Sequence, residues 1–284
     1  MTRAVWLVLV GIVSVQLGAA VAKGLFDELS PTTLVWLRLL TSTLVLLAWA
    51  RPRLRGRSRA DWYVVIGFGL SLGTMNWAIY QAFSRIPLGI AVTIEFIGPL
   101  SLALLGSRRV RDLLWVGLAA AGVVLLGAEP ADLDPVGVAF ALVAGAAWAS
   151  YILLSARTGA RWPGIDGLAI ASLIGTIPLT PYVLGAHGDQ LLSVRVLLIG
   201  LAVGLLSSVI PYTCELVALR TLKPSVFGIL MSLEPAAAAL AALLVLGEVL
   251  SALQVAALVC VVTAVAGATS TSRGGPTIAE PAPD

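Results

Sequence analysis

The chain is poor in charged residues, in cysteine and in histidine. Only 12% of its 284 residues are Asp, Glu, Lys or Arg and 59% are hydrophobic, which leaves no room for a soluble domain of useful size. Its two cysteines, Cys214 and Cys260, lie within apolar stretches and indicate neither a disulfide framework nor a metal site. The single histidine, His187, has no ligand partner near it in the sequence. The sequence therefore predicts no metal and no cofactor.

Long apolar segments occupy most of the chain instead. Ten of them, each of about 17–25 residues, are separated by short polar breaks, and a segment of this length is typical of a helix that spans a bilayer. We expect an all-α membrane protein with ten transmembrane helices. The spans are expected at residues 4–22, 32–50, 62–84, 88–106, 111–128, 135–156, 164–184, 193–219, 224–246 and 250–269.

Basic residues are concentrated in alternate connections between these spans. Short loops rich in Lys and Arg remain in the cytoplasm, so both chain termini are expected on that side. The densest cluster follows the second span; it could also be a nucleic-acid patch, but its place beside two spans favours a role in topology. The basic residues of this set are Arg3, Arg51, Arg53, Arg55, Arg57, Arg59, Arg108, Arg109, Arg111, Arg157, Arg161, Arg220, Lys223 and Arg273.

A weak internal repeat relates the two halves of the chain. A shift of 136 residues aligns 64–104 with 200–240 and pairs Pro99 with Pro235, each near the middle of the fourth span of its half. Five spans per half is an odd number, so the second copy is inverted in the membrane, as in many secondary transporters. Cleavage of the first span as a signal peptide would destroy this arrangement. We expect a first repeat over 1–130, a second over 131–269 and a disordered cytoplasmic tail over 270–284.

Charged residues inside the expected spans are few: Arg38, Glu95, Glu215 and Glu234. A charge at the bilayer centre costs at least ~2.5–3.5 kcal/mol, so each one needs a partner, an aqueous cavity or a function. Glu95 precedes Pro99 by four residues and Glu234 directly precedes Pro235, and each proline leaves the carbonyl four residues earlier without its helical donor. A carboxylate beside such a carbonyl suits an ammonium group or a proton. Alternatively, these glutamates only neutralise nearby cations.

Arg38 has two interpretations of equal weight. Its planar fork of donors could hold the carboxylate of a substrate, or it could pair with Glu95, since both residues lie about seven residues from the outer ends of their spans. Uncharged polar and aromatic residues in the spans either line a substrate cavity or bond one helix to another. Those included among the candidate substrate-binding residues are Gln16, Asn76, Trp148, Tyr151 and Tyr212.

Several motifs, in this order and spacing, are familiar. They are Ser14-Val15-Gln16, Leu37-Arg38-Leu39, Met75-Asn76, Pro87-Leu88-Gly89-Ile90-Ala91-Val92, Glu95-Phe96, Gly98-Pro99-Leu100, Trp148-Ala149-Ser150-Tyr151, Pro211-Tyr212, Met231-Ser232-Leu233-Glu234-Pro235 and Leu246-Gly247-Glu248. On these residues the chain resembles the EamA-type transporters of the drug/metabolite transporter superfamily, and within them the bacterial threonine/homoserine exporters. The resemblance extends over nearly all ten spans.

The resemblance implies a ten-helix, inverted-repeat exporter in the bacterial inner membrane. Such a protein moves small amino acids outward by alternating access, in exchange for protons, and its partners are the amino acid, protons and the bilayer. In that fold the third, fourth, eighth and ninth helices contribute to the central cavity, which fits Asn76, Glu95, Tyr212 and Glu234 as substrate-binding residues, with Glu95 and Glu234 in proton coupling. The first half departs from the family in lacking the Gly-Glu that Gly247-Glu248 provides in the second.

Two other classes of function remain open. An exporter of another small metabolite, such as an aromatic compound, a purine or a cationic drug, would need the same fold. A membrane-embedded enzyme would need a nucleophile with a base, a metal-ligand cluster or a catalytic loop, and the sequence contains none of these patterns. Nucleic acid is not an expected partner, and the sequence does not determine the oligomeric state.

Overall fold

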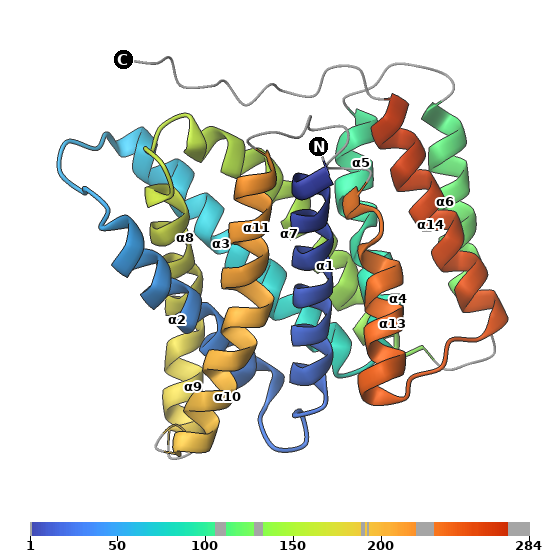
Figure 1. Cartoon of the computed structure of the whole chain (residues 1–284), viewed down its shortest axis with the longest axis horizontal. Helices are drawn as coiled ribbons and strands as arrows, with labels where there is room; N and C mark the ends of the chain where they lie inside the picture. The colour runs from blue at the N-terminus through green and yellow to red at the C-terminus, as the bar shows by residue number, and fades with distance from the viewer. Residues whose placement is uncertain are drawn as a thin grey trace.

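The computed structural model describes residues 2–105, 112–127, 133–188, 191, 193–219 and 230–271, and within these ranges it is helical and contains no strand. The helices stand side by side as a bundle (Figure 1). Helix α1 (Thr2–Lys23) begins and helix α14 (Ala252–Thr271) ends at the same end of the bundle. We call this end the N-terminal face and the other end the opposite face.

The helices follow the predicted apolar segments closely. The first half of the chain contains α1, α2 (Pro31–Ala50), α3 (Arg59–Phe83), α4 (Leu88–Glu95), α5 (Ile97–Leu105) and α6 (Asp112–Gly127). The second half contains α7 (Pro135–Gly159), α8 (Asp166–Thr176), α9 (Thr180–His187), α10 (Val194–Gly204), α11 (Ile210–Leu219), α13 (Glu234–Leu246) and α14. A 3-10 turn, Ile177–Leu179, joins α8 to α9, and a π-helical turn, Leu205–Val209, joins α10 to α11.

Six helical stretches among the described residues are long and apolar enough to cross a bilayer. They are Arg3–Lys23, Pro31–Ala50, Arg59–Phe83, Pro135–Gly159, Asp166–His187 and Val194–Cys214. The other four predicted spans correspond to shorter helices or run into residues 106–111, 128–132 and 220–229, which lie outside the description. Helix α14 reaches Thr271, two residues into the predicted tail, and residues 272–284 are also outside the description.

Local sequence signals explain where the helices begin. Ser30 precedes α2 and its hydroxyl accepts a hydrogen bond from the backbone of Thr33 at 3.1 Å, with proline at the first helical position. Ser58 and Asp61 form a reciprocal capping box at the start of α3. Asp134 caps α7 in the same manner, accepting from the backbone of Val136 at 2.8 Å. These caps satisfy donors that a helix end otherwise leaves unpaired.

Close contact between helices depends on glycine. A Cβ atom added to Gly73 of α3 would lie 2.8 Å from the carbonyl oxygen of Gly175 in α8, so the two backbones meet directly.

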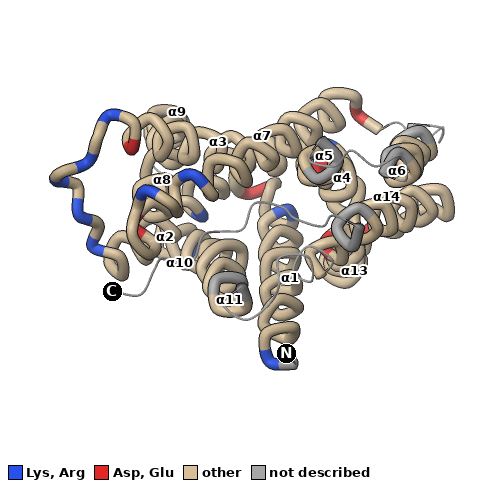
Figure 2. Tube along the Cα trace, turned by 90° about the horizontal axis from the view of Figure 1, so that it is seen from above, with Lys and Arg blue, Asp and Glu red and all other residues tan. Residues whose placement is uncertain are grey.

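Seen from above, α1 passes through the middle of the molecule with α11 on one side and α13 on the other (Figure 2). Large apolar side chains cover the outside, among them Leu198, Leu244 and Val249, which are all exposed. Buried polar groups inside and apolar groups outside are what a bilayer requires.

Candidate functional site

Arg38 is the buried cation of the bundle, with only 6% of the residue exposed. It lies on α2 and its guanidinium is bound by the π-helical turn between α10 and α11. Nε donates to the Ser208 hydroxyl at 3.0 Å, and Nη2 donates to the Ser207 carbonyl oxygen at 2.7 Å. A π-helical turn shifts the backbone pairing of a helix and so frees carbonyl oxygens for other donors. The turn thus provides a fixed seat for the guanidinium.

Helix α1 closes the other side of this turn. The Ser14 hydroxyl donates to the Leu206 carbonyl oxygen at 2.7 Å, so two consecutive carbonyls of the turn are satisfied by side chains from α1 and α2. Gly18, one turn further along α1, has no room for a Cβ because the Ser207 hydroxyl lies against it. The π-helical turn, Ser14, Gly18 and Arg38 are therefore one packed unit.

Two buried polar atoms without a described hydrogen-bond partner, the hydroxyls of Tyr80 and Ser207, lie at this unit. The Tyr80 ring on α3 lies 5.7 Å from the Arg38 guanidinium carbon, and its hydroxyl has no hydrogen-bond partner among the described residues. The same is true of the Ser207 hydroxyl, and also of Gln16 Oε1, which lies on the face of α1 turned away from Ser14 and Gly18. Burying a polar group without a partner is costly, so such groups indicate a place where another molecule binds.

Glu95 is the last residue of α4 and, like Glu234, is only 8% exposed. Its carboxylate is close enough to Arg38 to interact electrostatically, yet the ion pairs within 4.0 Å among the described residues do not include these two. Arg38 thus compensates the charge of Glu95 from a distance, while its own hydrogen bonds go to the π-helical turn. Neither interpretation of Arg38 drawn from the sequence included the π-helical turn as its hydrogen-bond partner.

The chain breaks its helix directly after Glu95. Phe96 separates α4 from α5, and Pro99 cannot donate to the Glu95 carbonyl oxygen. That carbonyl faces Gly145 of α7, where an added Cβ would lie 2.6 Å from it. Trp148, one turn further along α7, packs edge to face on Phe96 with ring centroids 4.7 Å apart. The freed carbonyl is therefore covered by α7.

Glu234 is the first residue of α13, after a turn at Ser232 and Leu233. Helices α4 and α13 run antiparallel, and Gly89 of the first lies against Ala239 of the second. Glu95 lies six residues after Gly89 and Glu234 five residues before Ala239, so at 1.5 Å per residue both lie about 8–9 Å from this contact toward the N-terminal face. The two carboxylates thus occupy the same depth in the bundle, each beside a break in its helix.

Three other candidate residues point to different neighbours. Asn76 is buried and its amide nitrogen donates to the Leu72 carbonyl oxygen of its own helix at 2.9 Å. Tyr151 packs against Phe68 of α3 with ring centroids 5.1 Å apart. Tyr212 lines a cavity of about 20 Å³ beside Trp49 and Thr213. The structure therefore groups Arg38 and Glu95 electrostatically and brings Trp148 to the break after Glu95, but it brings neither Tyr151 nor Tyr212 to Arg38 by any described contact. The Glu215 side chain lies outside the description.

A second polar cluster joins three segments at the opposite face. Lys23, at the end of α1, forms an ion pair with Glu248 at 2.6 Å and donates to the Ile86 carbonyl oxygen at 2.8 Å. Glu248, between α13 and α14, also accepts from the Leu88 backbone N–H at the start of α4, at 2.9 Å. We call Lys23, Glu248, Ile86 and Leu88 the clasp. It ties both halves of the chain together below the depth of Glu95 and Glu234.

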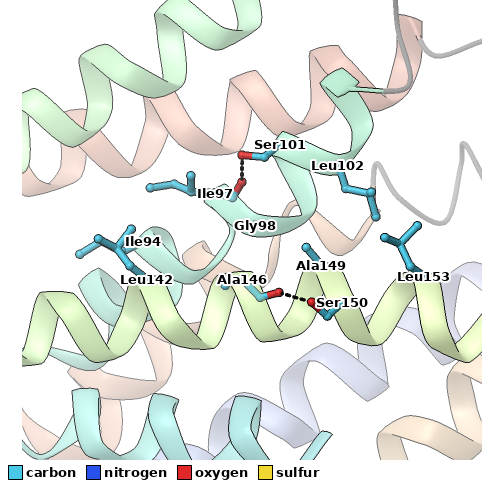
Figure 3. A pocket seen from close by; sticks show the side chains of 11 residues that line it. Ile94, Ile97, Gly98, Ser101, Leu102, Leu142, Ala146, Ala149, Ser150 and Leu153 are labelled. Carbon is cyan, nitrogen blue, oxygen red and sulfur yellow. Dashed lines mark hydrogen bonds between the residues drawn. The ribbon is translucent and has the colours of Figure 1, made fainter. Parts of the chain in front are cut away.

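A cavity of about 330 Å³ opens between α5 and α7 (Figure 3). Its lining is apolar apart from two hydroxyls, and both are bonded to their own helices: Ser101 to the Ile97 carbonyl at 2.7 Å and Ser150 to the Ala146 carbonyl at 3.0 Å. Leu142 and Leu153 at its rim are exposed on the outside of the bundle. With no charged group in its lining, this cavity suits hydrocarbon rather than a zwitterion.

Sequence reasoning missed the partners of Arg38 and the clasp. Ser207 occurs in the alignment of the two halves, and Tyr80 is a polar residue within a span, but neither pattern marks them as neighbours of Arg38. The signal for the π-helical turn is slight, since Ser207-Ser208 is a pair of hydroxyl residues in the middle of an apolar span. Lys23 and Glu248 are visible in the sequence as charges at span ends, without any indication that they meet.

Comparison with known proteins gives consistent matches along the chain. The model of the EamA-like transporter family matches residues 2–128 and 135–270. The threonine/homoserine exporter RhtA of Escherichia coli (strain K12) is 41% identical over 276 residues, covering 95% of this chain and 93% of that protein. The exporter of the same name from Salmonella typhimurium (strain SL1344) is 41% identical over 281 residues, covering 96% and 95%.

A more distant relative and a solved structure also match most of the chain. The uncharacterized transporter YwfM of Bacillus subtilis (strain 168) is 27% identical over 220 residues, covering 74% of either chain. One solved crystal structure of a protein superposes with a TM-score of 0.63 at 20% sequence identity, covering 93% of this chain and 96% of that one. This last likeness concerns the fold alone.

The seat of Arg38 can be tested by a double-mutant cycle. Arg38→Lys keeps the charge but loses the fork that reaches Ser208, so we expect it to lower the free energy of unfolding by about 1–3 kcal/mol in detergent. Ser208→Ala should add less in that background than alone, giving an interaction energy of about 0.5–3 kcal/mol. Ser150→Ala, on the outside of α7, should be additive with Arg38→Lys. Additivity of Ser208→Ala as well would contradict the proposed seat.

Proposed function

The chain belongs to the EamA-like transporter family, and from this premise we propose that it is a secondary active exporter of small amino acids of the threonine/homoserine type. The observation that carries the proposal is the 41% identity to threonine/homoserine exporters over 96% of the chain. The buried charges Arg38, Glu95 and Glu234 supply groups that a zwitterionic substrate requires. A transporter relocates its substrate without altering it, so no catalytic residues are assigned.

We propose further that ten helices form two inverted repeats of five, over residues 1–130 and 131–269, followed by a tail over 270–284. The two separate matches of the family model support this division. So do the helix breaks at Phe96 and at Ser232 and Leu233, which fall in the fourth predicted span of each half. We propose that the protein lies in the inner membrane of a bacterium with its N-terminal face in the cytoplasm, and the alternation of basic loops supports this orientation.

The substrate is proposed to bind between Arg38 and the two glutamates. Two donors of Arg38 are used by the π-helical turn, while Nη1 has no hydrogen-bond partner among the described residues and can bind the substrate carboxylate. Glu95 or Glu234 receives the substrate ammonium group. Gln16 Oε1 and the Tyr80 hydroxyl, both unpartnered among those residues, suit the side-chain hydroxyl that threonine and homoserine share. Asn76, Trp148, Tyr151 and Tyr212 complete the proposed cavity when it opens.

Proton coupling is assigned to Glu95 and Glu234. A buried carboxyl group can hold a proton in one state of the transporter and release it when a substrate ammonium group takes its place. Because both carboxylates lie at one depth, a proton and a substrate would compete for the same layer of the bundle. Such competition exchanges one for the other across the membrane.

Alternating access requires the opposite face to open, and the clasp is its proposed gate. Lys23 and Glu248 hold α1, the start of α4 and the connection before α14 together at the end of the bundle farthest from the N-terminal face. Under this proposal, the ion pair between Lys23 and Glu248 in the described structure corresponds to a closed gate. Release of substrate to the outside then requires that the ion pair separates.

Transport can be measured in proteoliposomes. We expect counterflow of radiolabelled threonine to be accelerated by internal threonine and by homoserine, and to be unaffected by internal threoninamide, which lacks the carboxylate that Arg38 binds. Ser150→Ala, outside the proposed site, should transport normally. Absence of counterflow with either amino acid, in protein that exchanges a purine or an aromatic compound, would assign the chain to the wider class of metabolite exporters.

Replacing each glutamate by glutamine separates a role in proton coupling from a role in substrate binding. Glu95→Gln and Glu234→Gln preserve shape but cannot ionise, so at least one should abolish threonine movement driven by a pH gradient, because a coupled cycle needs a titrating group. Counterflow without a gradient should persist in that variant if the other glutamate binds the ammonium group. Full gradient-driven transport in both variants would show that protons use another route.

The clasp can be held shut chemically. In a chain with Cys214→Ala and Cys260→Ala, the pair Lys23→Cys and Glu248→Cys should transport until a short bifunctional methanethiosulfonate reagent bridges the two thiols. Transport should then fall to background and return on reduction, because the gate can no longer open. The single variant Lys23→Cys, treated identically, controls for modification alone. Undiminished transport by the bridged protein would mean that the clasp stays closed during the cycle.

A further inference from the structure

The connection between α2 and α3 is a strongly basic loop that projects sideways from the bundle. It contains arginine at every second position, and we call residues 51–59 the arginine loop; its members are Arg51, Arg53, Arg55, Arg57 and Arg59. Figure 2 shows these basic positions as a row outside the ring of helices. The loop therefore lies over the surroundings of the protein rather than over its end.

One arginine anchors the loop while the others remain available. Arg57 donates to the Arg161 carbonyl oxygen at 3.0 Å and to the Arg53 carbonyl oxygen at 3.3 Å, and its guanidinium lies 4.5 Å from the centre of the Trp162 ring. The nearest acid, Asp61, is already bound to Arg161 at 3.0 Å and to the Ser58 backbone N–H at 2.9 Å. Arg51, Arg53, Arg55 and Arg59 make no ion pair with any described residue.

Apolar and aromatic side chains beside the loop set its height in the membrane. Trp49 is 60% exposed, Leu54 is 50% exposed and Tyr63 is 73% exposed, and all three lie within a few residues of the arginines. Exposed tryptophan and tyrosine next to a span are typical of the level of the lipid headgroups. At that level, the four guanidinium groups that form no ion pair with a described residue would lie beside the phosphates of the surrounding leaflet.

We propose that the arginine loop binds the headgroups of anionic phospholipids such as phosphatidylglycerol. A guanidinium group binds a phosphate through two parallel hydrogen bonds, and several basic residues next to a span attract an anionic leaflet. Topology alone would account for basic residues on this face, but not for a loop that is anchored by Arg57, directed outward and flanked by exposed apolar side chains. The inference does not depend on which substrate the protein transports.

Native mass spectrometry of the purified full chain tests this directly. With phosphatidylglycerol and phosphatidylcholine of identical acyl chains, we expect about ten-fold tighter binding of the anionic lipid, which weakens as salt is raised. Arg53→Gln with Arg55→Gln should remove most of this preference while the thermal stability stays unchanged. Arg51→Gln with Arg59→Gln should act likewise, so that the conclusion does not depend on one variant.

The matched control removes two exposed arginines from the same face but outside the loop. Arg3→Gln with Arg157→Gln should retain the preference for phosphatidylglycerol. Equal binding of the two lipids by the unmodified protein, or an equal loss in the control, would overturn the proposal. So would displacement of the lipid by inorganic phosphate at an ionic strength at which sodium chloride leaves the lipid bound, or binding of a short RNA by the loop in preference to phosphatidylglycerol.

Discussion

The hydrogen bonds between Arg38 and the π-helical turn are the interaction on which the interior of this bundle depends. A guanidinium group in a bilayer needs partners for its donors, and here a serine hydroxyl and a backbone carbonyl satisfy two of them. The carbonyl is free because Pro211, four residues later, has no backbone N–H to donate and because the helix widens at that point. Gly18 and Ser14 of α1 then fit the widened turn, so one irregularity of the backbone fixes the relative positions of α1, α2, α10 and α11.

Charged and apolar groups occupy different parts of the bundle around Arg38. Arg38, Glu95 and Glu234 are buried at the centre, whereas the cavity between α5 and α7 is lined by apolar groups and opens to the outside. Both central glutamates adjoin helix breaks, and a break within a bilayer is tolerated where other protein covers the freed backbone groups. Gly145 and Trp148 of α7 provide that cover after Glu95. The surrounding helices thus exclude lipid from the central layer, which allows this layer to contain polar groups.

The sequence predicted the helices well because about twenty consecutive apolar residues have few alternatives in a bilayer. It offered a pairing of Arg38 with Glu95 as one of two interpretations, since counting residues from the span ends gives both the same depth. It could not predict that Arg38 bonds to Ser207 and Ser208, because hydrophobic periodicity does not distinguish a π-helical turn from an α-helical one. The clasp was equally hidden, since residues 23, 86, 88 and 248 become neighbours only once the helices pack.

The clasp has a consequence for how such a chain can change over generations. Two of its four partners, at positions 86 and 88, contribute backbone atoms, so the clasp itself makes no demand on their side chains. The other two contribute an ammonium group and a carboxylate, and the loss of either one strands the other. The clasp therefore constrains Lys23 and Glu248 through their charges, whereas Ile86 and Leu88, both buried in the core, are constrained by packing.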